Sequence, residues 1–264
     1  YLKKIFVAFP EEITKTAETP AAEHLFKTAD GSDTSKRLSE EQAQTFHHTV
    51  AQLLFLCMRA RPDIQTAVSF LCTRVKQPDE DDYKKLARTV RYLRRTKFLR
   101  LTLEATSMHN LQWHIDGAFA VHPDMKSHTG GYFTLGKGAL VGICSKQKIN
   151  TKSSTEAELV AVNDCMHSVI WIRYFLKALG YQVPPATIHQ DNQSAILLET
   201  NGRASSSKRT RHINIRYFFV ADRVEKEEVQ VMYCPTDDMI GDFFTKPLQG
   251  AKFRKFQDVK IAKN

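Results

Sequence analysis

The sequence predicts a small, mainly helical region followed by an α/β domain built on a mixed β-sheet. Three observations support this prediction. Between residues 39 and 95, apolar residues recur at helical spacing in three segments. From residue 99 to residue 145, short apolar runs alternate with glycine-rich turns, as in strands. Beyond residue 153, patterns typical of helices and strands follow one another as far as Pro247, which is the order expected for α/β layers.

The helical region begins with a segment from Tyr1 to Phe9, which Pro10 ends. A polar connector follows. Three helices are then predicted, beginning after Ser39, at Pro62 and after Asp79. One face of the third helix is basic, and we expect it to be either solvated or a surface for phosphate groups; it carries Lys84, Lys85, Arg88, Arg91, Arg94 and Arg95.

Beyond residue 99, six segments read as strands and four as helices, and the α/β domain is predicted to run in the order three strands, helix, strand, helix, helix, strand, helix. The strands are expected at Leu99–Leu103, Leu111–Asp116, Gly131–Leu135, Leu140–Ser145, Ala186–Gln190 and Val229–Cys234. A long helix should begin after Ser153, since Glu156 completes a capping-box pattern, and end at Gly180. The other helices are expected at Asn192–Glu199, at Ile213–Glu227 and between Pro235 and Pro247.

The composition narrows the class of protein without identifying it. Of the 264 residues, 42% are hydrophobic and 25% are charged, which is ordinary for a globular protein, and no apolar run is long enough to cross a bilayer. The net charge of +9 is compatible with nucleic-acid binding. Five scattered cysteines without a Cys-x-x-Cys pair predict neither a zinc site nor a disulfide framework. Because the chain begins with Tyr1, we expect a piece of a longer polypeptide.

Acidic residues occur where two predicted strands end. Asp116 and Asp191 each end a predicted strand. In an open α/β sheet, functional residues gather at the carboxyl ends of the strands. In the long helix, Glu158 rather than Glu156 is in line with a buried stripe through Val162, so we expect Glu158 to point inward. Singly, Asp116 is also compatible with a turn and Asp191 with a helix cap. Together, such carboxylates predict a site for Mg²⁺ or Mn²⁺, which prefer oxygen ligands.

The last predicted helix supplies further acids, namely Asp237, Asp238 and Asp242. If this helix follows directly on its strand, these side chains should converge on the same edge of the sheet. Two divalent ions about 4 Å apart could then assist an in-line cleavage of a phosphodiester. The alternative for Asp237 and Asp238 is an interaction with the helix dipole in the first turn.

Several ordered motifs resemble the ribonuclease H domain of copia-type retrotransposon polyproteins. They are S-S-T-E-A-E-L (Ser153 to Leu159), H-Q-D-N-Q-S-A-I (His189 to Ile196), K-R-T-R-H-I-N-I-R-Y-F-F (Lys208 to Phe219) and D-F-F-T-K-P-L (Asp242 to Leu248). Upstream, A-R-P-D-I-Q-T-A-V-S (Ala60 to Ser69) resembles the segment that joins reverse transcriptase to ribonuclease H in that family. The resemblance covers nearly the whole chain.

The resemblance implies an RNase H-like fold, with a mixed five-stranded sheet flanked by helices and preceded by a small, mainly helical connection region. It implies hydrolysis of the RNA strand of RNA–DNA hybrids at a catalytic and metal-binding set of Asp116, Glu158, Asp191 and Asp242, with two Mg²⁺ ions or Mn²⁺ in their place. The implied domains are the end of a reverse-transcriptase thumb with a linker (1–37), the connection region (38–108), the RNase H-like domain (109–248) and a basic tail (249–264).

An RNA–DNA hybrid presents phosphates and 2′-hydroxyl groups, so basic and amide side chains near the acids are candidates for binding it. These candidates are Asn192, Gln193, Lys208, Arg209, Arg211, His212 and Arg216. The basic run is equally compatible with a solvated loop. The implied partners are the hybrid and the polymerase part of the same polyprotein, with no membrane and no small-molecule cofactor. The implied location is the cytoplasm, in virus-like particles.

Two other hypotheses compete with a ribonuclease. The first is a catalytically inactive module that binds hybrids or connects domains in a decayed element; the presence of all four acids argues against it. The second is an integrase or transposase of the same fold. These enzymes order their acids Asp, Asp, Glu, whereas here Glu158 precedes Asp191.

Overall fold

In the computed structural model, the chain is described at residues 1–9, 15–28, 36–201 and 214–261, and it forms two compact units. Unit 1 comprises Tyr1–Thr102 and Lys246–Asn264, and unit 2 comprises Leu103–Thr245. The predicted division into four domains remains a prediction. Its last segment, the basic tail, contains a helix that belongs to unit 1.

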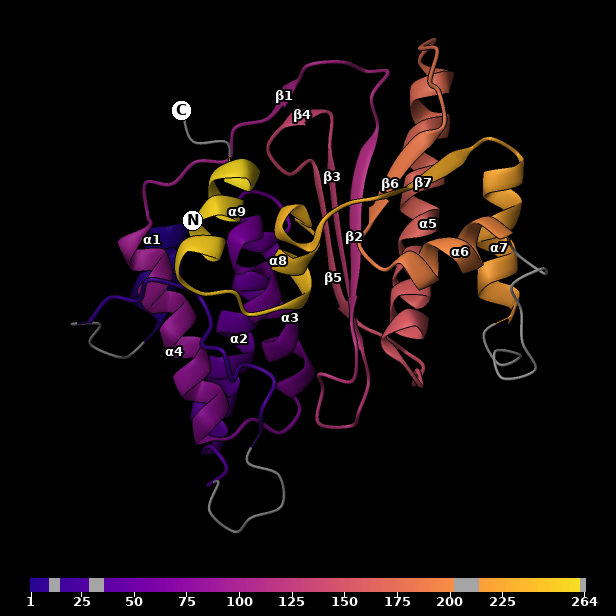
Figure 1. Cartoon of the computed structure of the whole chain (residues 1–264). Helices are drawn as coiled ribbons and strands as arrows, with labels where there is room; N and C mark the ends of the chain where they lie inside the picture. The colour runs from indigo at the N-terminus through magenta and orange to yellow at the C-terminus, as the bar shows by residue number, and fades with distance from the viewer. Residues whose placement is uncertain (10–14, 29–35, 202–213, 262–264) are drawn as a thin grey trace. The chain divides into compact units, whose positions relative to one another are not determined.

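Unit 1 is helical (Figure 1). Two of its helices begin at the polar residues predicted to cap them, and each cap forms a complete capping box: Ser39 with Gln42, and Asp79 with Asp82. Pro62 begins a short 3₁₀ turn that leads into a helix. The elements are α1 (Leu2–Ala8), α2 (Glu40–Cys57), η1 (Pro62–Ile64), α3 (Gln65–Arg74), α4 (Glu80–Arg95) and α9 (Gly250–Ile261).

Unit 2 is built on a five-stranded mixed sheet in the order β5-β3-β2-β6-β7. Its strands are β2 (Gln112–Ala118), β3 (His128–Thr134), β5 (Val141–Lys146), β6 (Ala186–Gln190) and β7 (Val229–Tyr233). The pairs β2–β3 and β3–β5 are antiparallel, whereas β2–β6 and β6–β7 are parallel. A separate two-stranded ribbon joins β1 (Glu104–Ala105) to β4 (Gly136–Lys137). The predicted architecture, a mixed five-stranded sheet flanked by helices and preceded by a helical region, is confirmed.

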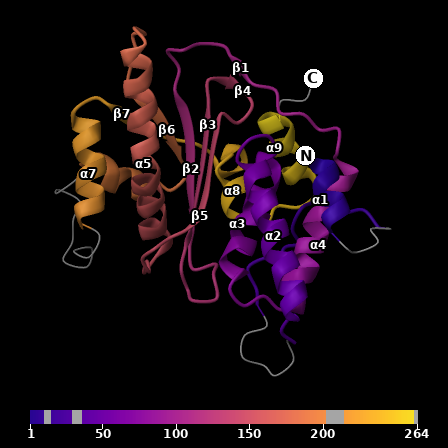
Figure 2. The ribbon, with the colours of Figure 1, turned by 180° about the vertical axis from the view of Figure 1, so that it is seen from behind.

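Helices cover both faces of this sheet (Figures 1 and 2). The long α5 (Ser154–Ala178) buries Val162, Cys165 and Val169 against Trp113 and other side chains of one face, so the predicted apolar stripe is confirmed. The helices α6 (Gln193–Asn201) and α7 (Asn214–Glu225) pack beside α5. The short α8 (Asp242–Thr245) lies on the opposite face, where Phe244 packs against Tyr132.

The structure corrects two predicted elements. The segment Leu99–Leu103 is not a strand, because its side chains are half-buried or exposed and give it no buried face. The helix predicted between Pro235 and Pro247 is also wrong. A 3₁₀ turn at Thr236–Asp238 ends in Met239, whose backbone is extended, and only four residues of α8 follow.

The cause of this break lies at Gly241. A Cβ atom there would be 2.9 Å from the Cβ atom of Asp116, so the chain approaches β2 too closely for any other residue. A regular helix that continued through residue 241 would lose this close contact with β2. Packing against β2 therefore leaves only the last turn of the predicted helix, which is α8.

Candidate active site

Three carboxylates meet at one edge of the sheet in unit 2. Asp116 lies in β2, Asp191 directly follows β6, and Glu158 lies in the second turn of α5. One oxygen from each group is within 4.8 Å of the corresponding oxygens of the other two. Since β2 and β6 are parallel neighbours, their carboxyl ends share an edge, as the sequence predicted.

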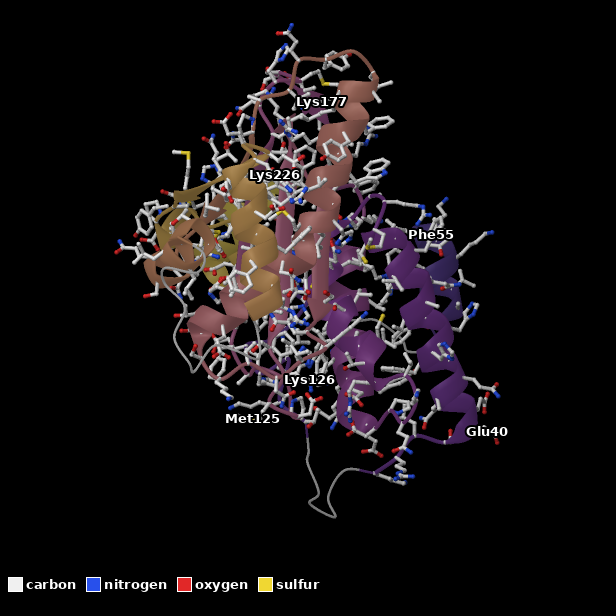
Figure 3. All side chains as sticks on the ribbon, turned by 90° about the vertical axis from the view of Figure 1, so that its right-hand side faces the viewer. Glu40, Phe55, Met125, Lys126, Lys177 and Lys226 are labelled. Carbon is white, nitrogen blue, oxygen red and sulfur yellow. The ribbon has the colours of Figure 1, made fainter. Side chains whose placement is uncertain are left out.

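The loop between β2 and β3 marks this end of the unit. Met125 and Lys126 lie in that loop, near the start of α5, whereas Lys177 lies at the other end of α5 (Figure 3). The candidate site is thus on the side of unit 2 where α5 begins.

Glu156 and Glu158 are both buried, but they have different partners. The Oε2 atom of Glu158 accepts a hydrogen bond of 2.7 Å from the backbone N–H of Gly117. The Oε2 atom of Glu156 accepts one of 2.7 Å from the N–H of Lys152, and the N–H of Glu156 donates to Oγ of the helix cap, Ser153. Glu156 therefore completes the start of α5, while Glu158 faces the two aspartates.

Gly117 allows α5 to come this close to β2. A Cβ atom at Gly117 would lie 2.5 Å from the carbonyl oxygen of Ala157 and 2.8 Å from the backbone nitrogen of Glu158. Any larger residue would push the first turns of α5 away from the strand. The glycine after Asp116 thus has a packing role, which differs from the turn considered in the sequence analysis.

Asp116 is held from the other face of the sheet by α8. Its Oδ2 atom accepts a hydrogen bond from Oγ1 of Thr245, the last residue of α8, and both residues are buried. The same hydroxyl is 3.3 Å from the carbonyl oxygen of Asp242. Thr245 was not identified from the sequence, because its partner is 129 residues away.

Asp242 lies buried at the start of α8, but its carboxylate is not part of the three-carboxylate group found among the described residues. Asp237 and Asp238 are exposed on the 3₁₀ turn. Neither belongs to the three-carboxylate group, but both lie on the turn whose Thr236 donates to Asp191, so their convergence on the site with Asp242 stays a prediction.

Gln190 connects two of the three acids. Its side chain is fully buried at the end of β6, and its Nε2 atom donates to Oε2 of Glu158 over 3.3 Å. Its Oε1 atom accepts from the backbone N–H groups of Asp191 at 2.8 Å and Asn192 at 3.1 Å. Gln190 was not predicted from the sequence, although an amide directly before a strand-ending aspartate is a usable signal.

Asp191 is the most exposed of the three acids, and its Oδ2 atom accepts a hydrogen bond of 2.9 Å from Oγ1 of Thr236. It does not cap α6. The side chain of Asn192 does so, by accepting from the N–H of Ala195 at 3.1 Å. The carboxylate of Asp191 is therefore left facing the other two acids.

The predicted nucleic-acid-binding residues are only partly described. Asn192 and the exposed Gln193 lie beside Asp191 at the start of α6. Arg216 is half-buried on α7, near enough to Asp164 for its charge to oppose the rise that burial causes in the pKa of that acid. Lys208, Arg209, Arg211 and His212 lie outside the described residues. Binding by any of the seven remains a prediction.

The electrostatics of the carboxylate group favour a cation. Burial, together with the negative charges of Asp116 and Asp191, raises the pKa of Glu158 well above its ordinary value, although hydrogen bonds from Gln190 and Gly117 oppose this rise. A divalent ion would remove the repulsion. Carboxylate oxygens are hard ligands, so the donor set fits Mg²⁺, Mn²⁺ or Ca²⁺ better than a metal that prefers sulfur or imidazole.

The chain is similar in sequence to Pol polyproteins of plant transposons. It is 29% identical over 255 residues to a retrovirus-related Pol polyprotein from transposon TNT 1-94 of Nicotiana tabacum, covering 96% of this chain and 19% of that protein. It is 32% identical over 209 residues to a retrovirus-related Pol polyprotein from transposon RE2 of Arabidopsis thaliana, covering 78% of this chain and 14% of that protein. The chain thus spans about a fifth or less of the length of these relatives.

Other comparisons add little. No protein-family model matches the chain. The structure of LC11-RNase H1, isolated from compost, aligns with 52% of this chain and 93% of that chain, with 15% identity and a TM-score of 0.39. In the described part of the chain, none of the helices is both long and apolar enough to cross a membrane.

Proposed function

Because this chain is homologous to a segment of the Pol polyproteins of copia-type retrotransposons, we propose that unit 2 is a ribonuclease H that hydrolyses the RNA strand of RNA–DNA hybrids during reverse transcription. The observation that carries the proposal is the meeting of Asp116, Glu158 and Asp191 within 4.8 Å at the carboxyl edge of a mixed sheet. The polymerase part of the same polyprotein is the proposed partner, and cytoplasmic virus-like particles are the proposed location.

We assign the binding of divalent metal to Asp116, Glu158 and Asp191, with Asp242 as the fourth acid at the start of α8. Two Mg²⁺ ions, or Mn²⁺, would supply a nucleophilic hydroxide from water and neutralise the charge on the leaving oxygen. The acids alone could not do this chemistry, since three neighbouring carboxylates repel a phosphodiester anion.

The protein's own contribution is to hold the carboxylates in position before a substrate arrives. Gly117 and Gln190 fix Oε2 of Glu158, and Thr245 fixes Oδ2 of Asp116. Asp191 is partly exposed, so the phosphate group of a substrate would approach from its side. Rigid ligands of this kind avoid the cost of arranging flexible carboxylates around an ion.

A cleavage assay tests the proposal. The purified chain would be incubated with an RNA–DNA hybrid labelled on the RNA strand, with Mg²⁺ or with a chelator, alongside labelled double-stranded DNA. We expect cleavage of the RNA strand of the hybrid with Mg²⁺ only. If the chain binds the hybrid but does not cut it with Mg²⁺ or Mn²⁺, the inactive binding module would replace the ribonuclease.

A further inference from the structure

Unit 1 contains a cavity of about 520 Å³, well away in sequence from the carboxylates, between the segment around Lys15–Leu25 and helix α4. Five of its lining side chains are basic, namely Lys15, Lys84, Lys85, Arg88 and Arg91, and two are acidic. The basic face of α4, for which the sequence left solvation and phosphate binding open, thus lines a hollow.

Both acids of the cavity already have basic partners. Asp81 forms an ion pair of 2.9 Å with Lys85. Glu18 pairs closely with Arg95 and more loosely, at 3.9 Å, with Arg254. Among the described residues, Lys15, Lys84 and Arg88 form no ion pair. The charge that remains in the cavity is therefore positive.

Arg88 is the central residue of this wall. Its Nη2 atom donates to Oγ1 of Thr19 over 2.9 Å, while its Nε atom is buried without a hydrogen-bond partner among the described residues. Burial and the charge of Arg91 lower the pKa of Arg88. The guanidinium group is therefore held in place next to a like charge, with an unused donor.

The segment opposite α4 is anchored, so the cavity has two fixed walls. The hydroxyl of Thr19 lies 2.8 Å from the carbonyl oxygen of Ala21 and 2.9 Å from Oε1 of Gln249. Thr89 of α4 donates to the carbonyl oxygen of Pro20 over 3.0 Å. These contacts join the segment to α4 next to Arg88.

We propose that this cavity binds a phosphate group, carried either by a free nucleotide or by the end of a nucleic-acid strand. Arginine forms paired, charge-assisted hydrogen bonds with phosphate oxygens, and an anion would relieve the repulsion between Arg88 and Arg91. The volume is within the range of pockets for small ligands, and a hollow admits a nucleotide or a strand end more readily than the middle of a duplex. This site is independent of the carboxylates in unit 2.

Binding would be measured on the full chain, in a chelator, so that metal at the carboxylates cannot hold phosphate. The probes are AMP, adenosine as its uncharged counterpart, and a fluorescent single-stranded DNA with or without a 5′-phosphate. We expect AMP to bind and adenosine not to bind if the ligand is a nucleotide. If the ligand is a strand end, we expect the 5′-phosphate to strengthen binding of the oligonucleotide.

The variants Arg88→Gln and Arg91→Gln should each weaken binding by about tenfold or more, as expected for the loss of a charge-assisted contact. Lys84→Gln provides a milder variant at an exposed position, for which we expect a smaller loss in the same direction. Arg94→Gln is the matched control: it removes the same charge from the same helix, but Arg94 does not line the cavity.

Thermal unfolding would show that the variants remain folded. The inference is overturned if neither AMP nor the 5′-phosphate binds better than its counterpart without phosphate. It is also overturned if Arg94→Gln weakens binding as much as Arg88→Gln and Arg91→Gln do. A failure of hybrid cleavage by unit 2 would leave these results unaffected, because they are obtained without divalent metal.

Discussion

Two single substitutions in α5 should change the stability of the protein in opposite directions: Glu158→Gln should raise it, and Glu156→Gln should lower it. Glu156 and Glu158 are two residues apart, equally buried, and each accepts one backbone N–H at 2.7 Å. Only Glu158 faces two other carboxylates. Comparing the two variants therefore separates two effects on stability: the repulsion within the carboxylate group, and the general effect of altering a buried glutamate at the start of a helix.

The expected size follows from the distances. With an effective dielectric constant of about 20, two unit charges 4.8 Å apart repel by roughly 3 kcal/mol. Glu158→Gln removes this repulsion, so without divalent ions we expect the free energy of unfolding to rise by about 1 to 4 kcal/mol near pH 8. Glu156→Gln weakens a charge-assisted contact at the start of a helix, so we expect a loss of about 1 kcal/mol.

The dependence on pH has a definite sign. Folding raises the pKa of Glu158 above its value in the unfolded chain, so the wild-type chain loses stability as the pH rises through the raised pKa. At about pH 4, where the unfolded chain also holds the proton, this penalty is absent. The advantage of Glu158→Gln should therefore grow from about pH 4 to pH 8.

Urea unfolding followed by tryptophan fluorescence is the appropriate assay, because both tryptophans, Trp113 and Trp171, lie in unit 2. Mg²⁺ should stabilise the wild type and Glu156→Gln at pH 8 but have much less effect on Glu158→Gln. Equal losses of stability in the two variants would refute the reasoning. So would an undiminished response of Glu158→Gln to Mg²⁺.

Three further predictions concern single residues of unit 2. Gln190→Leu leaves two backbone N–H groups without their acceptor, so we expect a loss of about 2 to 5 kcal/mol and weaker Mn²⁺ binding by titration. Gln147→Leu removes a buried amide whose hydrogen bonds among the described residues go to Thr129 and to the backbone of Ala157; it should lower stability but leave Mn²⁺ binding unchanged. Asp191→Asn should keep the melting temperature and lose most hybrid cleavage with Mg²⁺; cleavage at the wild-type rate would exclude Asp191 from the site. Glu199 is buried, and its carboxylate has no hydrogen-bond partner among the described residues, so burial raises its pKa well above the ordinary value. The stability of the wild type should thus fall as the pH rises through that pKa, and Glu199→Met should be more stable by about 1 to 3 kcal/mol at pH 8 in urea unfolding; an equal slope against pH in both proteins would contradict this.

Local sequence patterns were sufficient to predict the part of the site that depends on periodicity. Stepping along α5 from Val162 identified Glu158 as the inward acid, because side chains four residues apart share a face of a helix. Parallel pairing of β2 with β6 brought Asp116 and Asp191 to one edge. Each of these steps needs only the geometry of one helix or of two neighbouring strands.

The parts that were missed depend on contacts between distant segments. Thr245 reaches Asp116 across 129 residues, and the length of α8 is set by the approach of Gly241 to β2. No helix propensity encodes that approach, since the four residues before it would be acceptable in a helix. Likewise, Leu99–Leu103 has the apolar content of a strand, but a strand also needs a partner and a buried face.

The carboxylate group is held together by contacts outside itself, because its own charges repel. Asp116 lies between two close backbone approaches: α5 comes against Gly117 on one side, and Gly241 comes against Asp116 on the other. Hydrogen bonds from Thr245 and Gln190 add to this packing. The repulsion among the three carboxylates therefore lowers the stability of unit 2, and the packing around them offsets this loss. A divalent ion bound at the three carboxylates, as proposed, would remove that repulsion only in the folded state, so its binding and the stability of unit 2 would be linked.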